Sequence, residues 1–283
     1  DENIGNTLKL DADAAAFGTC EMIDENMANA GRVHTVENGK DIADFTMITF
    51  GGAGPLHAAR LCEKMGISTF LVPQGAGVGS AIGFLRAPFG YESVRSQVFN
   101  LSQFDFEAAS RLLLSMEAEA LGFVEGGLDN GAPIIERTVF MRYAGQGWDI
   151  PVQLPMSRFD VGSATAIAKS FERDYERFFG RAIEGLDIEI VSWSVKANSP
   201  VPPVAKVAAV AEGKVVNPSK TRRVFESAQG AYLDAGIHKR DSLKPGDVVE
   251  GPAIIVERET STLVTAAFRA LVQNDGCLRV TRR

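Results

Sequence analysis

The strongest candidate for chemistry is a glycine-rich run between an expected strand and an expected helix. Residues 45–50 alternate apolar and polar side chains as a β-strand does, and residues 56–65 have a helical pattern. Glycines let the backbone approach a ligand closely, and a following helix directs N–H groups and its positive dipole end at the same point. The joining run is Gly51-Gly52-Ala53-Gly54-Pro55-Leu56-His57. A phosphate group would be stabilised there.

The same run also has an explanation without a ligand. A tight turn from strand to helix needs glycines for its backbone alone. The run is neither a Walker A loop, since no Lys and Ser/Thr follow its last glycine, nor a GxGxxG motif. Pro55 lies near the first helical position, where its missing N–H costs nothing. His57 could meet a phosphate or a polarised carbonyl, although packing against the sheet is the commoner role for such a histidine.

A second glycine cluster, residues 75–83, follows an expected strand at 67–72 and precedes a helix-like segment. Ser80 could cap that helix. Gly77 and Ser80 could line the same cleft as the first run, because both joints follow neighbouring strands of one sheet. Close packing of helix on sheet explains these glycines too, and we favour that explanation from the residues alone.

Composition excludes several classes of protein. The chain has 283 residues, 45% of them hydrophobic, and a net charge of -7. Such a chain can build a sizeable core, and its acidity gives no general attraction to nucleic acid or anionic lipid. No apolar run reaches the length that a membrane-spanning helix needs. We therefore expect a globular protein without nucleic-acid or membrane partners.

The cysteines and histidines do not form a metal-binding pattern. Cys20, Cys62 and Cys277 are odd in number, far apart and without a CxxC pair, so zinc and a disulfide framework are poorly supported. We expect three reduced, buried thiols in a cytoplasmic protein. His34 and His238 have no neighbouring ligands at metal-binding spacing, so we expect no metal site built from this chain.

Pattern changes divide the chain into three stretches. Residues 1–96 alternate helix and strand signals, residues 97–198 have an α+β pattern, and residues 204–283 are β-rich, after a proline-rich connector at 198–203. In the first stretch, Asp11 and Asp13 can cap a helix that runs from Ala14 to Arg32. We expect that helix to bury a stripe of apolar residues, namely Phe17, Met22, Ile23 and Met27.

Residues around 45–85 resemble a known family closely. The run DFTMITFGGAGPLHAARLCEKMGISTFLVPQGAGVGSAIGFL is similar to the hydantoinase A / 5-oxoprolinase family, and later segments are similar to it too. These segments are MRYAGQGWDIPV, FERDYERFFG, EIVSWSVKA and RDSLKPGDVVEGPAIIVERETSTLV. The resemblance implies an α/β fold: an actin-like, sugar-kinase-like ATPase half domain, then an α+β segment and a β-rich C-terminal module. It also implies ATP with Mg, bound by Gly51, Gly52, Ala53, Gly54 and Pro55 with His57 alongside, and no biotin.

The chain departs from the family in one large respect. Full-length members begin with a phosphate loop of the D-x-G-G-T-x-T type, which is absent here, so the chain corresponds to the C-terminal part of such a subunit. The resemblance therefore implies a partner chain that supplies the loop within a hydantoinase A/B-type hetero-oligomer. This split arrangement resembles acetophenone carboxylase.

Three functions follow as hypotheses from this resemblance. The first is a subunit of an ATP-dependent carboxylase that phosphorylates a ketone for reaction with bicarbonate. The second is a subunit or fragment of a hydantoinase or 5-oxoprolinase, which phosphorylates a cyclic amide before hydrolysis. The third is a structural subunit in which the glycine run is inherited architecture. No residue identifies the substrate or a catalytic base.

Overall fold

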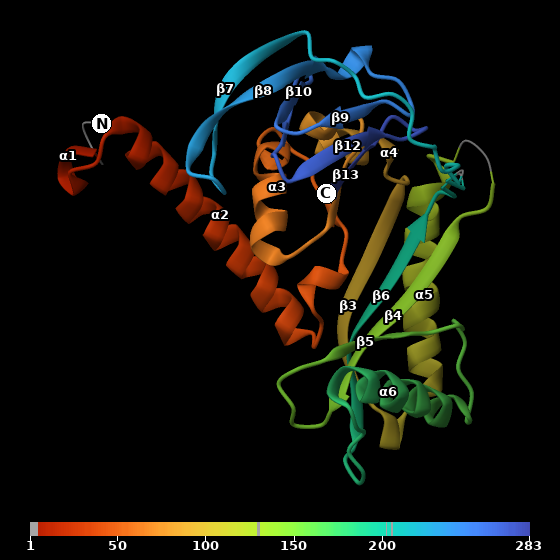
Figure 1. Ribbon diagram of the computed structural model, residues 1–283. Coiled ribbons are helices and arrows are strands. Elements are labelled where there is room, and N and C mark those ends of the chain that lie inside the picture. Colours follow the sequence, from red (N-terminus) through yellow and green to blue (C-terminus); the bar gives the residue numbers. More distant parts are fainter. Residues whose placement is uncertain (1–4, 129–130, 202, 205) are drawn as a thin grey trace. The chain divides into compact units, whose positions relative to one another are not determined.

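The computed structural model describes residues 5–128, 131–201, 203–204 and 206–283, and the chain divides into two compact units (Figure 1). Unit 1 comprises residues 1–86 and 205–283, and unit 2 comprises residues 87–204. The proline-rich connector at 198–203 includes residue 202, which lies outside the described residues. Among the described residues, no helix combines the length and apolarity needed to cross a membrane.

Unit 1 consists of helices and two sheets. Its helices and short helical turns are α1 (Gly5–Leu8), α2 (Ala12–Glu37), η1 (Ile42–Asp44), α3 (Gly54–Met65), η2 (Ala76–Val78), α4 (Gly79–Arg86) and η4 (Arg240–Ser242). Its strands are β1 (Met47–Ile48), β2 (Thr69–Val72), β7 (Lys220–Glu226), β8 (Ala231–Lys239), β9 (Val248–Glu250), β10 (Ala253–Val256), β11 (Ser261–Val264), β12 (Phe268–Val272) and β13 (Leu278–Arg282).

The larger sheet of unit 1 joins segments that are far apart in the sequence. Its strand order is β1-β2-β13-β12-β9, with β1 parallel to β2 and β13 antiparallel to β2. Val72 lies opposite Leu278, and Phe70 lies opposite Val280. The second sheet has the order β11-β10-β8-β7. The structure places residues 1–86 and 205–283 in one compact unit. The division of the chain into three domains, with boundaries near 96 and 204, stays a prediction.

The core of unit 1 lies between α3 and these sheets. Ala58, Ala59 and Cys62 form the fully buried side of α3, and small side chains let that helix lie close to the strands. Phe70 and Phe268 meet edge to face with ring centroids 5.7 Å apart. The helix stops at Gly66, whose φ of 74° is the left-handed conformation that glycine adopts without strain. The strand–helix–strand pattern expected over residues 45–72 is thus confirmed.

The helix expected near the N-terminus is present, but its orientation was predicted wrongly. The Asp11 side chain accepts from the backbone N–H of Ala14 and caps α2, as expected. Met22, Ile23 and Met27 are exposed instead of buried, and Phe17 is only partly covered by Phe225. Glu21 and Asp24 face α3 instead, because charged and polar side chains of α3 pair with them. Cys20 is exposed and Cys277 only partly buried, so the expectation of three buried thiols holds for Cys62 alone.

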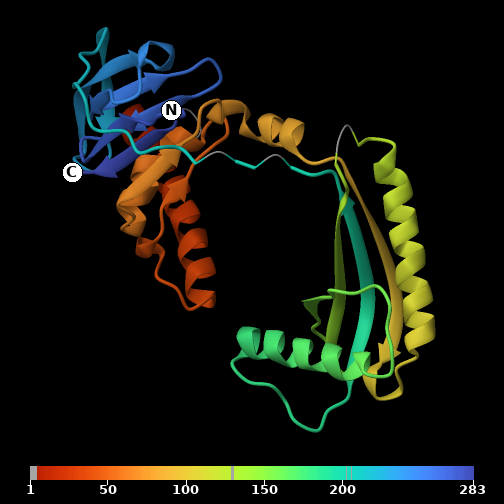
Figure 2. The same cartoon turned by 90° about the vertical axis from the view of Figure 1, so that its right-hand side faces the viewer.

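Unit 2 is one antiparallel sheet packed against helices. Figure 2 shows its long helix along one face of the sheet. The strand order is β3-β6-β4-β5. The elements are β3 (Gly90–Asn100), η3 (Leu101–Gln103), α5 (Phe106–Glu125), β4 (Ile134–Tyr143), β5 (Ile150–Gln153), α6 (Ser163–Phe179) and β6 (Ile188–Asn198). Trp193 is fully buried in the core, and its Nε1–H donates to the carbonyl oxygen of Gln97 at 2.9 Å.

Candidate functional site

The structure brings the two glycine-rich joints together. Gly51 follows β1, and its N–H donates to the carbonyl oxygen of Ala76, in the second joint, at 2.7 Å. The two joints come after β1 and β2, which are neighbours in the sheet, so this contact follows from the strand order. Both loops therefore lie at the carboxyl-terminal ends of β1 and β2, on the same side of the sheet.

The first joint needs glycine at two of its positions and leads directly into a helix N-terminus. Gly51 has a φ of 98°, which favours glycine, and a Cβ added there would meet open space. A Cβ at Gly54 would lie only 2.9 Å from the hydroxyl of Thr49, so that position needs a glycine. Ala53 precedes α3 without a side-chain cap, and Pro55 occupies the first turn. Helix N-termini of this kind direct unsatisfied N–H groups at whatever lies in front of them.

A turn between β10 and β11, residues 257–260, holds both joints from the far end of the sequence. The hydroxyl of Thr260 donates to the carbonyl oxygen of Gly52 at 2.8 Å. A Cβ added to Gly77 would lie 2.6 Å from Cβ of Glu259, so the second joint is packed directly on this turn. Sequence reasoning missed these residues, because no local pattern links positions about 200 residues apart.

A buried ion pair contacts the second joint, at the backbone N–H of Gly75. Arg240 Nη1 is 3.5 Å from Glu257 Oε1, and both side chains are more than nine-tenths buried. Arg240 also donates to the carbonyl oxygens of Val72 and Gly276. Burial raises the pKa of Glu257, while the guanidinium of Arg240 and the N–H of Gly75 oppose that shift. The pair thus ties the second joint to the sheet.

His57 is held by a buried carboxylate of the neighbouring helix. Its Nδ1 lies 2.7 Å from Asp24 Oδ1, and the side chains are 28% and 7% exposed. Because a carboxylate only accepts, Nδ1 carries a proton and Nε2 of the neutral ring is an acceptor. The geometry turns it towards α2, and a role beside a nucleotide remains a proposal.

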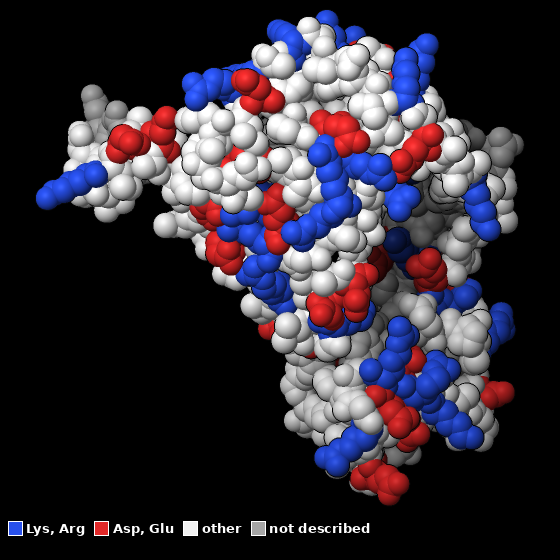
Figure 3. Space-filling model, viewed as in Figure 1, with Lys and Arg blue, Asp and Glu red and all other residues white. Residues whose placement is uncertain are grey.

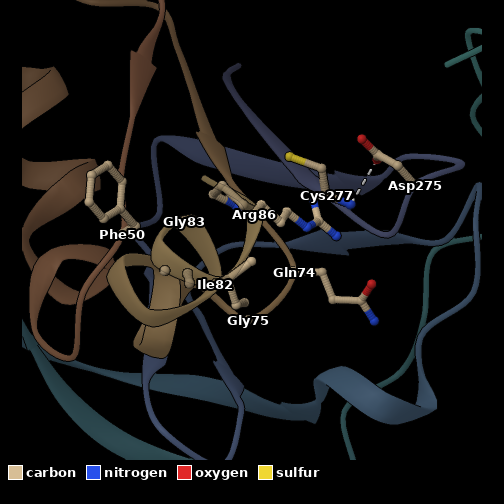
Figure 4. A pocket seen from close by; sticks show the side chains of 11 residues that line it. Phe50, Gln74, Gly75, Ile82, Gly83, Arg86, Asp275 and Cys277 are labelled. Carbon is tan, nitrogen blue, oxygen red and sulfur yellow. Dashed lines mark hydrogen bonds between the residues drawn. The ribbon is translucent and has the colours of Figure 1, made fainter. Parts of the chain in front are cut away.

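A cavity of about 740 Å³ opens beside the second joint (Figure 4). It is lined by Phe50, Pro73, Gln74, Gly75, Ala76, Gly79, Ile82, Gly83, Arg86, Asp275 and Cys277. Arg86 supplies a positive charge, and Asp275 accepts from the N–H of Cys277 at 2.9 Å. Gly77 and Ser80 belong to the same segment without lining the cavity. Small-molecule sites commonly have volumes of roughly 300–1,000 Å³.

No cluster of three or more His, Cys, Asp or Glu side chains in the described ranges could hold a metal ion.

Comparisons with known proteins place most of the chain in one family. Residues 2–92 match the Hydantoinase/oxoprolinase family, and residues 116–280 match the Hydantoinase/oxoprolinase C-terminal domain. An uncharacterized protein of Methanocaldococcus jannaschii is 32% identical over 99% of this chain and 39% of its own length. The acetone carboxylase beta subunit of Xanthobacter autotrophicus is 26% identical over 94% of this chain and 39% of its own length.

The fold is shared with a solved structure. The crystal structure of ATP-dependent caprolactamase from Pseudomonas jessenii superposes with a TM-score of 0.74, at 23% identity, over 98% of this chain and 41% of that one. The chain thus spans about two-fifths of the length of these relatives. The likeness shows that this mixed helix-and-sheet chain shares its fold with the corresponding part of that protein. On these matches, the chain belongs to the hydantoinase/oxoprolinase family.

Proposed function

We propose that this chain is one part of an ATP-dependent enzyme, and that its glycine joints bind the nucleotide phosphates. The observation that carries the proposal is the contact between the two joints, in which the N–H of Gly51, three residues before α3 begins, donates to the carbonyl oxygen of Ala76. Backbone N–H groups at such a point stabilise negative charge with little reorganisation. The caprolactamase relative is described as ATP-dependent, which supports the same ligand here.

The proposed nucleotide-binding residues are Gly51, Gly52, Ala53, Gly54 and Pro55, with His57, Gly77 and Ser80 close by in the same two segments. A Cβ at Gly51 would meet open space and one at Gly52 would lie 3.9 Å from its nearest neighbour, so the backbone at both positions is open to a ligand. Mg²⁺ would be bound through the nucleotide itself. We propose that the remaining wall of the site, with a D-x-G-G-T-x-T loop, lies in polypeptide outside these 283 residues.

The proposed reaction is phosphorylation of a carbonyl oxygen in a small substrate. The relative named acetone carboxylase favours a ketone as the substrate, with bicarbonate as the carboxyl donor. The sequence resemblance suggested an acetophenone-like ketone within that class. The relative named caprolactamase favours a cyclic amide, whose activated ring would then be hydrolysed. Both reactions need the same binding of the nucleotide phosphates by the glycine joints, so both fit this chain.

The test is Gly52→Val in the assembly that contains this chain, with an ATP analogue titrated against it. A Cβ at Gly52 would lie 3.9 Å from its nearest neighbour, the carbonyl oxygen of Glu259, so the substitution adds bulk at the proposed phosphate site without a close contact of its Cβ. We expect at least a tenfold loss of affinity, which corresponds to about 1.4 kcal/mol. Gly147→Val is the matched control, because a Cβ there also meets open space but lies in unit 2.

Unchanged analogue affinity in Gly52→Val would contradict the nucleotide role. If the wild-type assembly also binds no nucleotide, the chain acts as a structural subunit. If nucleotide binds, separate assays with ketone plus bicarbonate and with a lactam distinguish the two substrate classes.

A further inference from the structure

The larger sheet of unit 1 has arginines on the face that turns away from its core. Phe268 on β12 and Val280 on β13 are fully buried in the core that also contains α3. Arg269 and Arg279 follow or precede these residues in the same strands, so their side chains leave the sheet on the opposite face. Figure 3 shows Lys and Arg side chains, with some acidic ones among them, over the region where β12 and β13 lie in Figure 1.

The pairing of β12 with β13 brings these side chains to one place. Arg269 lies opposite Thr281, and Arg279 lies opposite Leu271. Arg269 and Arg279 are therefore diagonal neighbours on one face of the sheet, within reach of each other's long side chains. Arg282 is the last residue of β13. These five residues, with Glu212, line a cavity of about 270 Å³, which we call the arginine pocket.

The carboxylates beside the arginine pocket are already engaged. Arg269 donates to both carboxylate oxygens of Glu212, at 2.7 and 3.0 Å. Glu250 lies opposite Arg269 on β9, but it pairs with Arg283 instead. Neither carboxylate is therefore available to neutralise a further arginine.

Two guanidinium groups of the arginine pocket remain without a counter-charge. In the part of the chain that the structure describes, the side chains of Arg279 and Arg282 have no hydrogen-bond or ionic partner, and both are exposed. Arginine stays protonated in proteins, so three positive charges and one negative charge line this cavity. The chain as a whole has a net charge of -7, so the excess of positive charge is local.

The charge and size of the arginine pocket indicate the class of ligand. A single arginine in water needs no partner, but several that line one cavity repel each other, and a bound anion would remove that repulsion. The planar guanidinium binds phosphate oxygens two at a time. The cavity is smaller than the roughly 300–1,000 Å³ of drug-sized sites, so it suits a small ion better than a nucleotide.

We propose that the arginine pocket binds a doubly charged tetrahedral oxyanion, which is inorganic phosphate or the phosphate group of a small ester. Arg279 and Arg282 supply the charge, and the hydroxyl of Thr281 can donate to the same anion. Glu212 competes with the anion for Arg269. The arginine pocket shares no lining residue with the cavity beside the second glycine joint, so this inference does not depend on the proposed function.

The test is calorimetric titration of inorganic phosphate into the assembly that contains this chain. All variants also carry Gly52→Val, so that phosphate binding at the glycine joints does not contribute to the heat. Replacing both Arg279→Gln and Arg282→Gln removes the unpaired charges and should weaken phosphate binding at least tenfold. Arg111→Gln is the matched control and should change nothing, because Arg111 is 70% exposed and lies in unit 2.

Glu212→Gln is predicted to act in the opposite direction. It removes the competing carboxylate and frees the guanidinium of Arg269, so phosphate should bind at least threefold more tightly. This variant keeps both unpaired arginines, so it tests the proposal even if the double variant does not fold. Glycerol 3-phosphate is titrated in parallel. Binding of both probes assigns the pocket to a phosphate group, and binding of inorganic phosphate alone assigns it to the free ion.

Lack of saturable phosphate binding in the Gly52→Val assembly would overturn the proposal, and this result is expected if an acidic segment of polypeptide occupies the arginines instead. Equal losses in the double variant and in Arg111→Gln would overturn it too, as would weaker binding in Glu212→Gln. The ATP-analogue titration distinguishes this outcome from the proposed function. Lost phosphate binding with intact analogue binding in the double variant, on an unmodified Gly52 background, concerns the arginine pocket alone.

Discussion

The hydroxyl of Thr260 donates a hydrogen bond to the carbonyl oxygen of Gly52 over 2.8 Å, although the two residues are 208 positions apart. Glu259, its neighbour, lies against Gly77 in the other glycine joint. The candidate phosphate loop is thus held by a β-turn from the opposite part of the sequence. Residues in that turn position the loop without belonging to it.

Thr260→Val removes this hydrogen bond while it keeps the shape of the side chain. We expect a loss of about 1 kcal/mol in the free energy of unfolding, measured by urea denaturation, together with weaker nucleotide binding. Thr262→Val is the control, because the Thr262 hydroxyl is buried with no hydrogen-bond partner among the described residues. That change should be neutral or stabilising. Equal effects of the two substitutions would contradict a positioning role for Thr260.

Arg240→Met should be among the most destabilising single changes in unit 1. It would leave the buried carboxylate of Glu257 without its cation and would remove donors to two carbonyl oxygens. Breaking a buried pair in this way costs about 3–5 kcal/mol. Chemical denaturation of Arg240→Met, Glu257→Met and the double variant measures the coupling. A double variant less stable than Arg240→Met alone would show that the pair itself matters little.

The ion pairs of Glu21 predict a pH dependence of stability. Hydrogen bonding to Arg60, with a smaller contribution from Lys64, lowers the pKa of Glu21 from 4.5 to about 2, against the effect of burial. Because the folded-state pKa is lowered, this stabilisation is complete above the unfolded value of 4.5 and is lost as the pH falls towards about 2. The difference in Tm between wild type and Glu21→Gln should therefore shrink over that interval.

Glu107→Gln serves as the control for this pH series. Glu107 lies 3.7 Å from Arg111 and its side chain is 72% exposed, so its ion pair should contribute little at any pH. If the Tm difference between wild type and Glu21→Gln stays constant as the pH falls from 4.5 to about 2, the ion pairs of Glu21 are not its cause.

The cysteines should react with thiol reagents in a fixed order. Burial, with a smaller effect of Glu63, raises the pKa of Cys62 to about 12. Burial, reinforced by Asp275, also raises the pKa of Cys277. At about pH 8 we expect Cys20 of the isolated chain to react first, since the thiolate is the reactive form and Cys20 is exposed. Labelling followed by peptide mapping checks the order, and rapid native labelling of Cys62 would contradict it.

Local signals in the sequence were sufficient for the first glycine joint. Alternating residues indicated β1, Pro55 and the apolar spacing indicated α3, and Gly66 marked the end of that helix. Their order along neighbouring strands allowed the two joints to share a cleft, but close helix–sheet packing was the favoured explanation of the second joint, and its contact with the first came from the structure. These features depend on residues that are close together in the chain.

Features that depend on distant residues were not predictable from one sequence. Nothing near Gly52 indicates Thr260, and nothing in β2 indicates that β13 lies beside it. Strand β3 was missed because most of its residues are exposed, so it shows little apolar alternation. The direction of α2 was mispredicted because apolar spacing identifies a face of a helix but does not say whether the core or another surface covers it.

The place of β13 within the sheet has a consequence for the order in which the protein forms during synthesis. Residues 278–282 are the central strand, between β2 and β12, and they carry Leu278 and Val280 into the core. During synthesis, both glycine joints are therefore translated long before the central strand that completes the sheet beside them. Late pairing across such a sequence distance slows folding. The joints should become resistant to protease only after residue 282 has left the ribosomal exit tunnel.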